Sequence, residues 1–336
     1  MHMADALVSP PVATGMAVAS LAVGAYSIFK IKKENKPENI PVMGVMGAFV
    51  FATQMVNFTI PGTGSSGHLC GGLLLSALIG PYGGFLSMMA ILLLQCLLFA
   101  DGGLMAYGCN VWNMAFYACF FGYFCIYKPI LKKNPSKKKI LIASILGSVL
   151  SLQLGAFSVT LETLISGITE LPFLTFLSFM QPIHLAIGFV EGLITSAVLI
   201  FVYNTRPEML NINEKSNEFS FKKVIAILGI VTILIGGGIS LLASSSPDGL
   251  EWSMENVAGS TELDSKGSAY DKASEIQEKT AILPDYSISN SNNEILGTSF
   301  SGILGSVLVA VILICGSLIF RFYKKGAKNE QTRKSA

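Results

Sequence analysis

Residues 183–203 read IHLAIGFVEGLITSAVLIFVY, an apolar run in which Glu191 is the one charged side chain. A helix of this length can span the hydrocarbon core of a bilayer, which is roughly 30 Å thick. Helices also satisfy their own backbone hydrogen bonds in lipid. Similar runs recur at 12–31, 42–57, 69–82, 85–100, 104–127, 140–160, 224–243 and 301–320. The sequence therefore predicts an all-α polytopic membrane protein with nine spans.

The composition of the 336-residue chain excludes ordinary soluble classes. It is 51% hydrophobic and 13% charged, whereas globular domains carry about 25% charged residues. The formal net charge of +2 is too small to indicate a nucleic-acid partner. The high hydrophobic fraction instead indicates that a lipid bilayer surrounds the protein. No GxxxxGK[ST] motif occurs, and we expect no ATPase on this chain.

The positions of the basic residues predict the orientation. Twenty of the 23 lysines and arginines fall in segments 30–36, 128–139, 206–223 and 321–334. These segments share one side of the membrane if nine spans alternate, and basic loops favour the cytoplasm. We expect the N-terminus outside, the C-terminus in the cytoplasm, and segments 57–68, 101–103 and 244–299 facing outward.

The pattern of spans divides the chain into two parts. Residues 1–205 form a predicted seven-helix core, 206–222 a cytoplasmic linker, and 223–336 an accessory region with two helices around an extracytoplasmic loop, 244–299. That loop is polar and has few apolar residues, so we expect much of it to be poorly ordered. The span at 69–82 is short, which indicates a steep helix or a flanking loop that dips into the membrane.

Histidine is scarce, and two of the three histidines, His2 and His68, lie on the expected outer side. A bulky His2 should leave Met1 in place with a free amine. The Met1 amine, the His2 amide nitrogen and the His2 imidazole could chelate one metal ion, and His68 could supply a fourth nitrogen. Such a planar set suits Ni²⁺ or Cu²⁺, whereas Zn²⁺ prefers a tetrahedron. The alternatives are a frayed His2 and a His68 that only hydrogen-bonds its loop.

Other polar residues lie at or near outward helix ends, and burying such side chains in lipid costs free energy. Side chains that could orient the ligands are Asn57, Gln95, Asn110, Asn113 and His184. The alternative is that the amides only hold helices together. Glu191 needs a buried partner and could be an anchor or a proton relay. The six cysteines include no CxxC pair, so they indicate packing residues and not a disulfide framework.

Several motifs together resemble the CbiM/NikM substrate-capture components of energy-coupling-factor (ECF) nickel and cobalt importers. The similar stretches are MHMADAL at 1–7, GTGSSGHL at 62–69, LQCLLFADGG at 94–103, GCNVWNM at 108–114, and residues 180–195. SSPDGLE at 245–251 resembles the PDGLE signature of the small CbiN/NikN accessory subunit, here fused to the core.

The resemblance implies a prokaryotic cell-membrane component that captures Ni²⁺ or Co²⁺ from outside, with Met1, His2 and His68 as ligands. It implies no catalytic residues on this chain. A transmembrane coupling protein and cytoplasmic ABC-type ATPases would be separate partners. The planar nitrogen set favours nickel over cobalt.

Three other functions remain open from the sequence. An ECF component for an organic vitamin would need an aromatic-lined pocket and would tolerate changes at His2. An intramembrane metalloprotease is disfavoured because no HExxH motif occurs. A membrane scaffold would leave the outward histidine and asparagine cluster unexplained.

Overall fold

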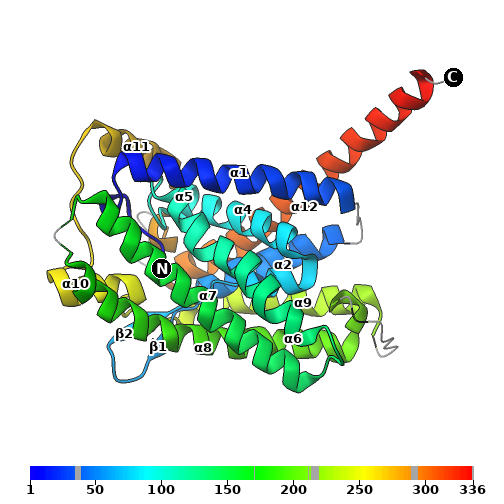
Figure 1. Cartoon of the computed structure of the whole chain (residues 1–336), viewed down its shortest axis with the longest axis horizontal. Coiled ribbons are helices and arrows are strands. Elements are labelled where there is room, and N and C mark those ends of the chain that lie inside the picture. Colours follow the sequence, from blue (N-terminus) through cyan, green and yellow to red (C-terminus); the bar gives the residue numbers. More distant parts are fainter. Residues whose placement is uncertain (35–38, 170, 211, 213–218, 289–293, 335–336) are drawn as a thin grey trace.

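The computed structural model describes residues 1–34, 39–169, 171–210, 212, 219–288 and 294–334, and it is mostly helical (Figure 1). The core contains α1 (Pro10–Glu34), α2 (Asn39–Gln54), α3 (Gly72–Ile79), α4 (Pro81–Phe99), α5 (Tyr107–Asn110), the π-helical Val111–Tyr127, α6 (Lys128–Leu131), α7 (Lys137–Ser166) and α8 (Phe173–Thr205). The accessory region contains α9 (Phe221–Gly237), α10 (Gly249–Ala258), α11 (Ser268–Thr280) and α12 (Glu294–Lys334).

Six segments of the described helices are long and apolar enough to cross a membrane: Pro10–Glu34, Pro81–Phe99, Tyr107–Leu131, Lys137–Ser166, Phe173–Thr205 and Leu296–Ile319. The expected nine full crossings are not confirmed. α2, α3 and α9 have 16, 8 and 17 residues, and eight helical residues reach only about 12 Å. Pro81 separates two of these helices, because α3 ends at Ile79 and α4 begins at Pro81.

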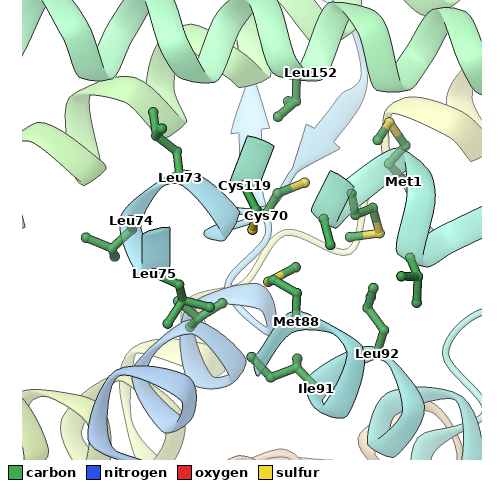
Figure 2. Close-up of a cluster of buried hydrophobic side chains, with 14 of the residues drawn as sticks. Met1, Cys70, Leu73, Leu74, Leu75, Met88, Ile91, Leu92, Cys119 and Leu152 are labelled. Carbon is green, nitrogen blue, oxygen red and sulfur yellow. The ribbon is translucent and has the colours of Figure 1, made fainter. Parts of the chain in front are cut away.

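Glycines allow close packing of the helices. α7 lies along α8, where a Cβ atom on Gly192 would stand 2.5 Å from the Ile145 Cα and one on Gly188 2.9 Å from the Val149 Cα. The accessory helices α9 and α12 both pack against α2. Apolar side chains fill the space between α3, α4 and their neighbours, and Figure 2 shows Met1 and Cys70 at this cluster beside Leu73 and Met88.

Two features differ from the sequence-based expectations. The segment before α3 forms a short antiparallel hairpin, in which β1 (Phe58–Ile60) pairs with β2 (Ser65–Gly67) and Thr59 lies opposite Ser66. Gly62 and Gly64, with φ of 79° and 76°, make its turn. The expected disorder of loop 244–299 is wrong for its described residues: α10 and α11 form there because apolar residues such as Leu250 and Tyr270 are buried against the core.

The N-terminal segment, the hairpin, α10 and α11 gather at one end of the molecule, as Figure 1 shows on its left side. The short α6, the C-terminal end of α8 and the N-terminal end of α9 lie at the opposite end. The residues predicted to bind metal and the described part of loop 244–299 therefore share one end.

Candidate metal site

The N-terminal segment enters the protein core and is held there by its backbone. Met3 and Leu7 are fully buried. The Met3 N–H donates to Asn110 Oδ1 (2.7 Å), and Asn110 Nδ2 donates back to the Met3 carbonyl (3.1 Å). The Gly103 N–H donates to the same carbonyl (2.9 Å). These bonds fix the position of the two residues before Met3.

His68 follows β2 and is held from α8. Glu191 is completely buried and accepts the N–H groups of Cys70 (3.0 Å) and Gly71 (3.1 Å) through its two carboxyl oxygens. It is thus an anchor for the segment after His68. The His68 Nδ1 lies 3.2 Å from the Leu69 carbonyl oxygen. Because that oxygen can only accept, Nδ1 carries the proton and the Nε2 lone pair is free to bind.

The predicted nitrogen donors meet between these two segments. The Met1 amine lies 3.1 Å from His68 Nε2, and the His2 and His68 rings stack with centroids 5.2 Å apart at 17°. Metal–nitrogen bonds of about 2.0–2.1 Å would place two adjacent ligands about 2.9 Å apart, so the amine and His68 fit one ion. The His2 Nδ1 faces Asp101 Oδ1 at 3.0 Å and would have to turn from it to join a chelate.

Side chains alone do not make a metal site in the described part of the chain. No group of three or more His, Cys, Asp and Glu side chains there is arranged to hold a metal ion. A site at His68 therefore depends on the backbone nitrogens of the N-terminal segment.

The accessory region also reaches this point. Asp248, at the start of α10, forms a hydrogen-bonded ion pair with the Met1 amine, and its Oδ2 lies 3.9 Å from His68 Nε2. The Tyr286 hydroxyl donates to Asp101 Oδ2 (2.5 Å). The residues predicted to be ligands are thus enclosed by the core on one side and by the accessory region on the other.

Burial and neighbouring charges set the protonation states. Burial, with the charges of the Met1 amine and the His2 ring, lowers the pKa of His68 to about 3. Burial also lowers the pKa of His2, although Asp101 opposes it. Burial lowers the pKa of the amine, but Asp248 raises it by more, so the net pKa lies above the ordinary value. At neutral pH both imidazoles are neutral and the amine is a cation paired with Asp248.

The residues predicted to orient the ligands divide into two groups. Asn110 bonds Met3 directly, and Asn113 donates to Met3 Sδ (3.5 Å) and to the Glu162 carboxylate (2.7 Å). Gln95 donates to the Tyr286 hydroxyl (3.3 Å), which in turn contacts Asp101 beside His2. His184 lines a small cavity together with Met1 and His68.

Asn57 was also predicted to orient the ligands, but its described contact lies elsewhere. Its backbone carbonyl accepts the Ser244 N–H (2.7 Å), which ties the end of α2 to the accessory region. The sequence analysis also did not assign Asp248 or Tyr286 to the site. The PDGLE-like motif contains Asp248, but the residues around it do not predict that its carboxylate contacts Met1.

Comparisons with known proteins identify the family of this chain. Residues 2–209 match the CbiM family, described as the cobalt uptake substrate-specific transmembrane region, and residues 222–321 match the PDGLE domain. A protein of Archaeoglobus fulgidus that carries the name fused nickel transport protein NikMN is 32% identical over 93% of this chain and 96% of its own length.

Two further similarities cover less of the chain. A Lactiplantibacillus plantarum protein that carries the name fused nickel transport protein LarMN is 32% identical over 76% of this chain and 79% of its own. The crystal structure of a truncated transition metal transporter is 29% identical, with a TM-score of 0.53, and covers 60% of this chain and 98% of that one.

Proposed function

This chain belongs to the CbiM family and carries a PDGLE domain, and from this premise we propose that it is the substrate-binding component of an ECF-type importer. As a multi-pass membrane protein of the nickel and cobalt transport type, it would capture Ni²⁺ or Co²⁺ from outside the cell. The observation that carries the proposal is the 3.1 Å approach of the buried Met1 amine to His68 Nε2.

The proposed ligands are the Met1 amine, the His2 amide and imidazole nitrogens, and His68 Nε2. Asn110 holds the N-terminal segment, and Glu191 holds the segment after His68. Because burial keeps the His68 imidazole neutral, its lone pair is available at neutral pH. A planar nitrogen set with one deprotonated amide favours nickel over cobalt, and the fused arrangement also occurs in relatives named as nickel transport proteins.

The proposed topology puts this site on the outer face of a prokaryotic cell membrane. Nine crossings, with the N-terminus outside and the C-terminus in the cytoplasm, would place the basic segments inside. In support, α6, the C-terminal end of α8 and the N-terminal end of α9 lie at the end of the molecule opposite the N-terminal segment (Figure 1). The hairpin and the short α3 would together make one crossing, with His68 below the membrane surface.

The proposed domains are a metal-capture core at 1–205, a cytoplasmic linker at 206–222 and an accessory region at 223–336. The chain would be a transporter component and not an enzyme. ATP hydrolysis and inward release would need a transmembrane coupling protein and cytoplasmic ABC-type ATPases on other chains.

The vitamin alternative receives no support from the site. The cavity beside Met1 and His68 has a volume of about 10 Å³, whereas organic ligands occupy pockets of roughly 300–1,000 Å³. No Phe, Tyr or Trp contributes to its lining among the described residues.

A titration tests the proposal. Ni²⁺ and Co²⁺ are added to purified protein that begins at Met1, to a version with one extra residue before Met1, and to a control with one extra residue at the C-terminus. We expect tight binding to the first and third proteins and its loss in the second, with nickel bound more tightly than cobalt. Equal binding to all three proteins would exclude the amine from the ligand set.

A further inference from the structure

Two residues of the accessory region hold the N-terminal segment from opposite sides. Asp248 pairs with the Met1 amine. Tyr286 donates to one oxygen of Asp101, whose other oxygen faces the His2 Nδ1 at 3.0 Å. These contacts join the accessory region to both residues that carry the proposed chelate.

The local structure of Asp248 fixes its carboxylate in this position. Asp248 is the N-cap of α10, and its Oδ1 accepts the N–H groups of Leu250 (2.7 Å) and Glu251 (3.0 Å). The other oxygen, Oδ2, is left to face the amine. The preceding Pro247 is tied to the hairpin, because its carbonyl accepts the Ser66 N–H (2.8 Å).

The hairpin gives this loop a second attachment. The Trp252 Nε1 donates to the Thr63 carbonyl (2.9 Å), so α10 is fixed to the same segment that leads to His68. Asp248 and His68 are therefore positioned relative to each other by one continuous unit of structure.

Tyr286 is likewise fixed by packing. Its ring stacks on Phe99 with centroids 4.6 Å apart at 20°, and its hydroxyl also accepts from Gln95 Nε2 (3.3 Å). Both contacts come from α4, at the end where Asp101 follows the helix. The aromatic stack thus orients the hydroxyl toward Asp101 and, through it, toward His2.

We infer that the accessory region completes the capture site, with Asp248 as the positioning residue for the Met1 amine and Tyr286 as the positioning residue for His2 through Asp101. This inference rests on the proposed function, because it assigns roles at the same site. The Met1 ammonium carries one positive charge, and Ni²⁺ bound to one deprotonated amide carries the same net charge, so the Asp248 carboxylate faces a cation in both states. Asp248 therefore holds the amine beside His68 before the metal arrives.

The variant D248N tests the first role. Asparagine is as good an N-cap as aspartate, so α10 is retained while the charge is lost. The matched control is E255Q, which makes the same change on the exposed side of α10. Y286F removes the hydroxyl and keeps the stack on Phe99, and Y26F on the exposed face of α1 is its control.

Two measurements are made on each full-length protein. The first is hydrogen exchange of the N-terminal peptide without metal, and the second is nickel affinity by titration. D248N removes a hydrogen bond to a charged group, which stabilises the docked N-terminal segment. We therefore expect D248N to raise the exchange rate of the N-terminal peptide about tenfold or more and to lower the nickel affinity about tenfold or more. For Y286F we expect a rise in exchange of about threefold or more, with both controls unchanged.

The outcomes separate the inference from the proposed function. If the native protein binds nickel and D248N matches it in both measurements, the inference is wrong and the proposed function stands. If the native protein binds neither nickel nor cobalt, the proposed function fails. The exchange measurement then still decides whether Asp248 and Tyr286 hold the N-terminal segment.

Discussion

Asn110 is predicted to hold the N-terminal segment in the core, and N110A should release it. The Asn110 side chain makes two hydrogen bonds with the Met3 backbone, at 2.7 and 3.1 Å, and is 3% exposed. Alanine fits the helix at this position but can make neither bond. The change therefore acts on the docking of the segment and not on the helix that carries Asn110.

The magnitude follows from the two bonds. The Met3 N–H loses its partner, and an unsatisfied buried donor costs about 1–3 kcal/mol. The Met3 carbonyl loses one bond, about 0.5–1.5 kcal/mol, but keeps the one from Gly103. The free energy of opening the segment should fall by about 1.5–4.5 kcal/mol, so the opening constant should rise about 10- to 1,600-fold.

Hydrogen exchange of the N-terminal peptide in metal-free protein measures this opening directly. The control is N256A, because Asn256 is exposed and its side chain bonds its own helix at the Trp252 carbonyl (2.8 Å). Nickel affinity should fall in the same direction, by no more than the rise in opening. Exchange in folded N110A within threefold of the native protein would refute the reasoning.

Two further predictions concern the same segment. Nickel affinity should fall about a hundredfold per pH unit from pH 8 to pH 6, because the Met1 amine, whose pKa is raised, and the His2 amide must each lose a proton to bind. His68, with a pKa of about 3, stays neutral in this range. Titrations at constant ionic strength measure this, and a slope of about tenfold or less per pH unit would remove the amine or the amide from the ligand set. G103A should weaken nickel binding more than about tenfold, because a Cβ there would clash with the Asp5 carboxylate and lie 2.5 Å from the Asp5 backbone nitrogen. G15A, whose Cβ would meet nothing within 4 Å, should bind nickel normally, and equal affinities for both variants would show that the segment does not need this close approach.

The sequence by itself determined the class of the protein and its family. Each long apolar run is a local property of the chain, so runs such as 140–160 predicted the position of α7, which extends over Lys137–Ser166. The motifs at 1–7 and 62–69 also identified the CbiM family, which the family match confirms. They singled out His2 and His68 because histidines are scarce, and the structure brings these residues together, while their role as ligands stays a prediction.

Only the tertiary structure decided what surrounds these histidines. The hydropathy of 69–82 predicts one apolar span, but α3 has only eight residues because it ends at Gly80, before Pro81. Glu191 needed a partner, but its partners are backbone N–H groups about 120 residues away, which no side-chain pattern specifies.

The role of Asp248 shows the limit most clearly. Its motif specifies a helix N-cap, a local property that uses one carboxyl oxygen. The other oxygen reaches an amine 247 residues away because α9 and α12 pack on α2 and the hairpin holds Pro247. Local sequence encodes which groups can bind; the packing of distant helices decides which of them meet.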